Sequence, residues 1–228
     1  MAMSPLLARR HLLRGAALLP LVAIGACTTP LGSYSLGDGI HRLLTLSSQR
    51  AFARLLQPGG FYDDQLTRIT VPQQVAGGRD GDVLAAILRT RAVRDRIAFA
   101  LNDVAVDAAD RATPVVLDAI RGLSVADAVS VLRGGPTAAT TLLERQARGA
   151  VVDAMFPEIG GALRSDGAEI LGAVIAARTG VNYTALARDV AEQAGSAIFR
   201  AIGREEAAIR ADPLATRDPV LIAVLGGR

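Results

Sequence analysis

The chain has 228 residues, a formal net charge of +3 and a sequence pI near 9.7, and all 25 of its basic residues are arginines. Only 4% of the residues are aromatic and tryptophan is absent, but half are apolar, which excludes an intrinsically disordered chain, and the lack of a glycine or proline period excludes a fibrous one. The single cysteine excludes an intramolecular disulfide framework and a cysteine-rich zinc site, and the length suits one domain around one core.

Residues 1–26 have the organisation of a bacterial export signal. Arg9, Arg10 and Arg14 form a basic region, and the apolar run that follows is too short to span a bilayer comfortably. The run ends in the letters IGAC at Cys27, which resemble a lipobox. In proteins with that motif the signal is cleaved before the cysteine, whose sulfur and new amino terminus are then acylated. The alternatives are an ordinary signal peptide with a chance cysteine and a buried structural cysteine.

The letters RRHLLR at the start of the signal also resemble a twin-arginine export motif, although a Sec signal is equally consistent with them. Thr28 follows the cysteine, and the lack of an aspartate there favours sorting to the outer membrane. We therefore expect an outer-membrane lipoprotein that faces the periplasm and is held by more than one acyl chain on Cys27.

The positive charge belongs to the signal. Removal of residues 1–26 removes three arginines and no acidic residue, which leaves 22 arginines and 22 acidic residues in the mature chain. The mature protein is thus formally neutral and has neither an RNA-binding motif nor an aromatic platform for stacking bases. We expect an envelope protein as its partner, with a hydrophobic ligand as the alternative, and no nucleic acid.

The mature chain begins with a polar stretch and continues as helices. Residues 27–37 are small and polar and are expected to form a flexible tether before a helical domain over 38–228. The first helix is predicted over about 38–57, where a Pro-Gly-Gly sequence stops it. A loop is expected over 59–72, and short helices over about 81–90.

The second half of the chain continues this pattern. Apolar residues repeat with helical spacing between 93 and 112, with aspartates on the other side, and Ser124-x-x-Asp127 resembles a capping box. Gly-Gly-Pro breaks the chain, with Pro136 suited to the first turn of the next helix, whose apolar stripe is expected to end before Pro157. Further helices are predicted over about 166–178, 184–211 and 218–225.

These segments together predict an all-α fold, a compact multi-helix domain that is either orthogonally packed or bundle-like. Abundant alanine permits close helix contacts but limits the area buried by each residue. We therefore expect stability to come from tight packing rather than from bulky side chains.

Few residues of the mature chain suggest chemistry. A lone histidine, His41, cannot form a histidine-rich metal site, and its place on a predicted helix favours a structural or solvent-facing role. Asp63 and Asp64 form an adjacent carboxylate pair that could serve in acid–base catalysis or bind a divalent cation, but turn formation is the expected role. The same holds for Asp80 and Asp82. We expect no metal and no cofactor.

Glu205 is more informative, because it falls within the apolar arc of a helical wheel that starts at Leu186. Glu206 and Arg210 fall outside that arc. A buried carboxylate must be paired, protonated or beside a cavity, and we interpret Glu205 as the partner of an arginine from another helix. A ligand-facing or catalytic carboxylate is the alternative. The arc consists of Leu186, Val190, Ala194, Ile198, Ala201, Ala208 and Ile209.

Several short motifs follow one another in the order found in one bacterial family. They comprise Gly59, Gly60, Phe61, Tyr62, Asp63 and Asp64; Arg68 to Pro72; Asn102; Asp118 to Ile120; Asp127 and Ala128; Gly134 to Thr140; and Glu205, Glu206, Ile209, Arg210, Asp212 and Pro213. Together they resemble the uncharacterised family called domain of unknown function 4197.

The sequence departs from the family pattern in places. Asp103-Val-Ala-Val follows Asn102 where the family has Arg-Ala-Ala-Glu, so no role of that glutamate carries over, and Asp212 replaces the usual asparagine. The resemblance implies a helical, signal-bearing envelope protein and no established activity.

Three functions are consistent with these features. The first is a non-enzymatic, lipid-anchored structural or interaction module of the envelope. The second is a carrier that holds a hydrophobic ligand in a groove between helices, with Glu205 or an arginine at the head group. The third is a hydrolase that uses Glu205 with Asp63 and Asp64.

Overall fold

The computed structural model describes residues 35–76, 86–87, 90–126, 128–164 and 182–226. Over these ranges the chain is helical and contains no β-strand, which confirms the predicted all-α class. The export signal, Cys27, Asp127 and the helix predicted over 166–178 lie outside the described residues, as does most of the segment 81–90. No described helix combines the length and the apolar content needed to cross a bilayer.

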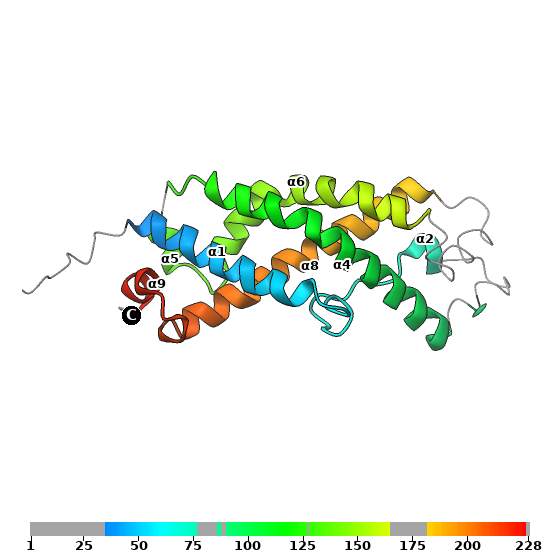
Figure 1. The fold of residues 1–228 in the computed structure, drawn as a ribbon, viewed down its shortest axis with the longest axis horizontal. Helices are drawn as coiled ribbons and strands as arrows, with labels where there is room; N and C mark the ends of the chain where they lie inside the picture. Colours follow the sequence, from blue (N-terminus) through cyan, green and yellow to red (C-terminus); the bar gives the residue numbers. More distant parts are fainter. Residues whose placement is uncertain (1–34, 77–85, 88–89, 127, 165–181, 227–228) are drawn as a thin grey trace, which may run out of the picture. The chain divides into compact units, whose positions relative to one another are not determined.

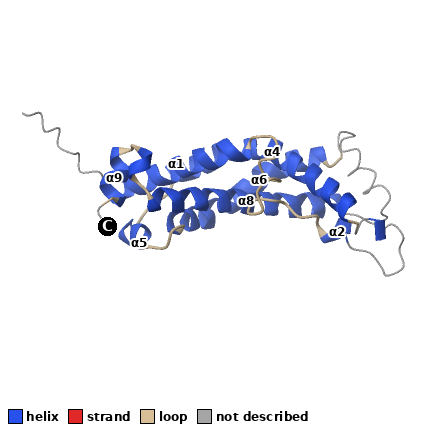
Figure 2. Ribbon diagram, turned by 90° about the horizontal axis from the view of Figure 1, so that it is seen from below, coloured by secondary structure: helices blue, strands red, loops and turns tan. Residues whose placement is uncertain are grey.

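Four long helices build the core of the described domain (Figures 1 and 2). They are α1 (Leu36–Leu55), α4 (Arg91–Arg121), α6 (Ala138–Ala162) and α8 (Tyr183–Ala211). Helix α8 packs against α6, α1 and α4, and α6 also packs extensively against α4. Because α8 has neighbours on several sides, it buries residues over a wide arc rather than along one narrow stripe.

Shorter elements close this core. They are α2 (Gln73–Ala76), α5 (Ala128–Arg133), the 3₁₀ helix η1 (Leu214–Thr216) and α9 (Pro219–Leu225). Helix α9 packs against α1, and α5 contacts both α1 and α6. Asp218 caps α9 by accepting hydrogen bonds from two of its first backbone amides, and the same carboxylate is paired with an arginine of α1.

The close helix contacts expected from the alanine content are present between α6 and α8. A Cβ atom on Gly195 would lie 3.1 Å from a methyl carbon of Val152, so the missing side chain allows the two helices to approach. The buried face of α8 also carries five alanines, namely Ala187, Ala191, Ala194, Ala197 and Ala201. Small residues thus allow tight packing along this helix, which also buries the larger side chains of Leu186, Ile198 and Phe199.

Several helix boundaries differ from the prediction. Helix α1 begins at Leu36, after Ser35 and Asp38 form a capping box, so it includes the end of the segment expected to be a tether. Helix α6 begins after Pro136 and continues through Pro157, where we expected it to end. Pro157 is exposed, as is Asp153 one turn earlier, so water can reach the carbonyl group that the proline leaves unpaired.

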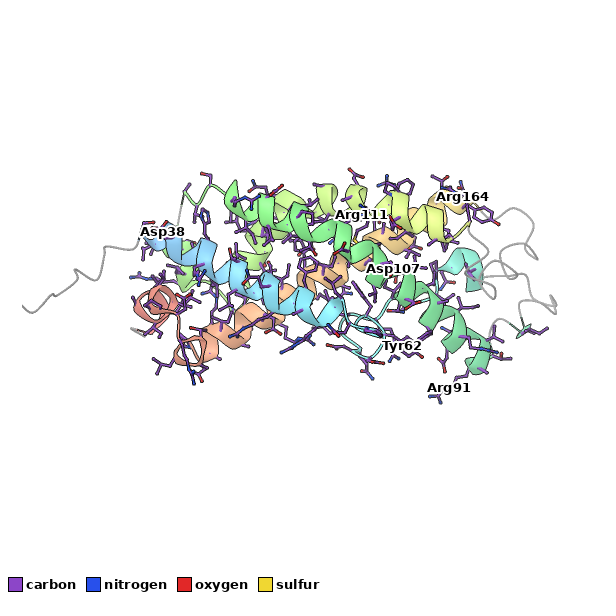
Figure 3. All side chains as sticks on the ribbon, in the orientation of Figure 1. Asp38, Tyr62, Arg91, Asp107, Arg111 and Arg164 are labelled. Atoms are coloured by element: carbon purple, nitrogen blue, oxygen red, sulfur yellow. The ribbon has the colours of Figure 1, made fainter. Side chains whose placement is uncertain are left out.

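The polar side of α4 is placed as predicted. Asp95, Asp103, Asp107 and Asp110 are all exposed, whereas Ile97, Leu101, Ala105 and Ala108 are fully buried. Figure 3 shows Asp107 on this helix, near Arg111 one turn further on.

Candidate functional site

The loop after α1 contains the first motif that resembles the family. Gly59 has a φ of 77°, a left-handed conformation that glycine adopts without strain. A Cβ atom on Gly60 would lie 2.4 Å from the carbonyl oxygens of Arg54 and Leu55, so only glycine allows the loop to fold back onto the end of α1. Phe61 is fully buried, and it fixes the loop to the hydrophobic core.

The next residues of the loop lie against α4. Tyr62, labelled in Figure 3, meets Phe99 edge-on with 5.4 Å between the ring centroids. The guanidinium of Arg68 lies 4.3 Å from the centre of the Tyr62 ring, and its Nε donates a 2.6 Å hydrogen bond to the Tyr62 carbonyl oxygen. These contacts hold the middle of the loop in one conformation.

Asn102 of α4 holds the end of the loop. Its Oδ1 accepts a 2.8 Å hydrogen bond from the backbone amide of Ile69, and its Nδ2 donates a 3.0 Å hydrogen bond to the Ile69 carbonyl oxygen. The same Nδ2 also donates to the carbonyl oxygen of Ala98 at 2.6 Å. Asn102 and Ile69 are both buried, so this asparagine satisfies two backbone groups that have no access to water.

The two loop aspartates have different surroundings. Asp63 is exposed, whereas Asp64 forms an ion pair and hydrogen bond with Arg204 of α8 and accepts a hydrogen bond from the Leu66 amide. The hydrogen bond from the Arg204 guanidinium is the main cause that holds the pKa of Asp64 below its usual value. Asp64 therefore stays ionised at neutral pH and ties the loop to α8.

Glu205 forms the structural pair that we expected from its position on the wheel. Its side chain is only 4% exposed, and its Oε1 lies 2.7 Å from a terminal nitrogen of Arg54 on α1. The Arg54 side chain is 62% exposed, so its charge keeps much of its hydration. Glu205 thus links α8 to the end of α1, next to the loop that contains Gly59 and Gly60.

The prediction for Glu206 and Arg210 is wrong. Both were expected outside the apolar arc, but their side chains are only 0% and 6% exposed. Ala208, which was assigned to the arc, is exposed instead. The physical reason is that other helices surround α8 on more than one side, so a second face of it, including the residue next to Glu205, is also buried.

Glu206 joins three helices. Its two carboxylate oxygens accept hydrogen bonds from the backbone amides of Ala139 and Thr140, at 3.0 and 2.7 Å, in the first turn of α6. Arg210 Nε donates to Glu206 at 2.7 Å, and its terminal nitrogens donate to the carbonyl oxygens of Val131 and Leu132 in α5. A carboxylate at a helix N-terminus is favourable because its negative charge lies at the positive end of the helix dipole, and because its oxygens accept hydrogen bonds from amides that have no partner within the helix. We call Glu206 and Arg210 the buried clamp.

A groove opens between α6 and α8 beside the loop. It encloses about 330 Å³, and most of its surface is apolar. We call it the α6–α8 groove; its walls include Leu66, Thr137, Thr140, Phe199, Arg200, Gly203, Arg204 and Ala207. Two polar atoms of these residues, Thr140 Oγ1 and Arg204 Nε, are buried and have no hydrogen-bond partner. The groove thus joins side chains from the loop, from the start of α6 and from α8.

The remaining candidate residues have structural places or lie outside the described ranges. His41 Nε2 lies 2.9 Å from the carbonyl oxygen of Leu123, which joins α1 to the segment after α4. Asp80 and Asp82 are outside the described residues. Within the part of the chain that the structure describes, no three histidine, cysteine or acidic side chains lie close enough to hold a metal ion.

With this geometry in place, comparison with known proteins identifies the family. The family described as a protein of unknown function (DUF4197) matches residues 31–226. The chain belongs to this family. Comparison with curated proteins and with solved structures gave no match. The resemblance seen in the sequence motifs is therefore confirmed.

The structure explains why separate motifs of this DUF4197 domain belong together. Asp64, Thr140 and Glu206 come from three distant parts of the sequence and meet around the α6–α8 groove and the buried clamp. Sequence reasoning did not single out Arg54 or Arg204, the partners of the motif carboxylates. Arg204 could have been noticed because it directly precedes Glu205, but no sequence signal connects Arg54 with α8.

Proposed function

We propose that this DUF4197 protein is an outer-membrane lipoprotein that faces the periplasm, and that its helical domain is a non-enzymatic structural or interaction module of the envelope. The observation that carries this proposal is the use of the motif residues. Asp64, Asn102, Glu205 and Glu206 are each engaged in contacts that join one element of the domain to another. Two of these contacts hold residues that line the α6–α8 groove, because Asp64 binds Arg204 and Glu206 binds the amide of Thr140. The groove is a surface feature suited to a partner.

The carrier function is the second candidate, because the groove is apolar and two arginines line it. A carrier would need to shield most of a hydrophobic ligand from water. The α6–α8 groove is open. In addition, Glu205, which was a candidate to bind the head group, is already paired with Arg54. These two features favour the interaction module.

The hydrolase function has less support. General acid catalysis needs a carboxyl group that retains a proton near the working pH. Arg204 lowers the pKa of Asp64, so that carboxyl group is ionised and cannot donate a proton at neutral pH. Glu205 is paired with Arg54, which leaves the exposed Asp63 without a second free carboxylate among the proposed catalytic residues.

The anchor can be tested by the intact mass of the protein extracted from membranes. We expect a chain that begins at Cys27 and carries the added mass of acyl groups, because the IGAC sequence is typical of a cleaved and acylated lipoprotein. A Cys27→Ser variant, which lacks the thiol that is acylated, serves as the control. It should either retain its signal peptide or be absent from the membrane fraction. An unmodified amino terminus at any other residue would refute the anchor.

The interaction function can be tested by photo-crosslinking in intact cells. A benzophenone amino acid in place of Leu66, which is 40% exposed at the groove, should give one discrete protein adduct. The same group in place of Leu214, which is 66% exposed in η1, is the matched control and should not give that adduct. Turnover of a small substrate by the purified protein, abolished in a folded Glu205→Ala variant, would contradict the proposal.

A further inference from the structure

The α6–α8 groove has the size and lining of a site for one large apolar side chain. A dry cavity of about 150 Å³ lined by aliphatic and aromatic residues can hold a benzene ring, and the groove offers about 330 Å³. Ala207 of α8 is partly exposed and Leu66 is 40% exposed, so these two side chains contribute apolar surface, whereas Phe199 is only 2% exposed. An aliphatic or aromatic group would therefore gain contact area on entering it.

The polar groups at the groove require an acceptor. Thr140 is 3% exposed, and its hydroxyl oxygen has no hydrogen-bond partner. Arg204 Nε is also buried without a partner, although Nη1 of the same guanidinium is bound to Asp64. A guanidinium N–H can only donate and a hydroxyl can donate, so both groups would be satisfied by an oxygen that accepts.

The charge at the groove favours an anionic acceptor. Arg200 lines it as well and uses only its Nε, which donates a 2.7 Å hydrogen bond to the Leu66 carbonyl oxygen. Glu144 is the acidic residue of the lining, and its carboxylate is paired with Arg148 at 2.6 Å. Because Asp64 already balances the charge of Arg204, Arg200 supplies the unbalanced positive charge at the groove. A carboxylate there could accept from the terminal nitrogens of Arg200, and hydrogen bonds to charged groups are the strong ones.

We propose that the α6–α8 groove binds a peptide segment of a partner protein, in which an aliphatic or aromatic side chain stands next to a carboxylate. This inference rests on the proposed interaction function. A peptide fits better than a free fatty acid because the groove is open, so its occupant must bring a surface of its own that excludes water from the apolar side chains of Leu66 and Ala207. The carboxylate lies toward Arg200 and Arg204, and the apolar side chain lies between α6 and α8.

Defined small probes can test this assignment on the full mature protein in lipid nanodiscs. The probes are acetyl-glycyl-leucine with a free carboxylate, its leucinamide counterpart, acetyl-glycyl-serine and octanoate. Binding is followed by NMR signals of the Thr140 methyl group and the Arg204 Nε–H group. We expect the leucine acid to shift both signals and to bind about tenfold more tightly than the amide, because the amide lacks the charge. The serine probe should give no shift at the same concentration.

Two neighbouring alanines of α8 provide matched variants. Ala207 lines the groove and Ala208 is exposed outside its lining, so a leucine at 207 fills the groove and a leucine at 208 does not. We expect Ala207→Leu to weaken binding of the leucine acid at least about tenfold, and Ala208→Leu to bind as the wild type does. Circular dichroism melting of both variants controls for folding.

Each other outcome overturns the inference. Equal binding of the acid and the amide would show that the carboxylate is not recognised. Binding of the leucine acid by Ala207→Leu as tightly as by the wild type would show that the α6–α8 groove is not the binding site. Tighter binding of octanoate than of the leucine acid assigns the site to a lipid carboxylate instead of a peptide. If none of the probes binds while the crosslink from position 66 persists, this inference fails and the proposed interaction function stands.

Discussion

Replacing Glu206 with alanine is expected to lower the free energy of unfolding by about 3–5 kcal/mol, the range typical when one partner of a buried ion pair is removed. The substitution leaves the guanidinium of Arg210, which is only 6% exposed, without its counter-charge. It also leaves the amides of Ala139 and Thr140 without their acceptor at the start of α6. Urea unfolding, followed by circular dichroism, measures the change.

The adjacent glutamate is the matched control. Glu205→Ala should cost less than Glu206→Ala, because its partner Arg54 is largely exposed and can be hydrated when the carboxylate is gone. Glu206→Gln should fall between Glu206→Ala and the wild type, since an amide oxygen can still accept one of the two amide hydrogen bonds. Equal costs for the two alanine variants would mean that the buried clamp does not stabilise the fold in the way described.

The second large effect is expected from Asn102. Asn102→Ala leaves both the amide and the carbonyl of Ile69 buried without a partner, and each such group costs about 1–3 kcal/mol. We expect a loss of about 2–4 kcal/mol in stability. The same substitution should abolish the hydrogen-exchange protection of the Ile69 amide, because that amide is held by the asparagine side chain alone.

Another asparagine provides the comparison for this variant. Asn182 caps α8 from an exposed position, so Asn182→Ala should cost about 1 kcal/mol and leave Ile69 protected. Asn102→Asp tests the geometry, because the carboxylate can accept from the Ile69 amide but cannot donate to the Ile69 carbonyl. Full protection of Ile69 in Asn102→Ala would show that the loop does not depend on this contact.

These expectations separate two uses of the motif residues in this DUF4197 domain. The buried clamp and Asn102 are expected to determine whether the domain folds, whereas the substitution of Ala207 in the groove is expected to affect binding alone. A motif shared with a family therefore does not by itself identify the binding residues. In this domain, most motif residues with charged or amide side chains are occupied by contacts within the fold.

The sequence by itself determined the class of the fold and much of its helical content. The helical spacing predicted α8 and α9 close to their observed bounds, and it placed Glu205 on a buried face. Because a buried carboxylate needs a counter-charge, an arginine partner could be expected as well. These features depend on interactions between residues close in sequence, or on burial, and both leave a periodic pattern along the chain. Family membership could also be inferred from the motifs.

Only the tertiary structure decided which residues make up the groove and its supports. Glu206 bonds to amides more than sixty residues away, Asn102 bonds to a loop 33 residues away, and Asp64 meets Arg204 across 140 residues. A helical wheel assigns one buried face to each helix, but α8 packs against α1, α4 and α6 and buries more than one. The burial of Glu206 was set by these neighbouring helices, whose positions are not encoded in the periodicity of α8 itself.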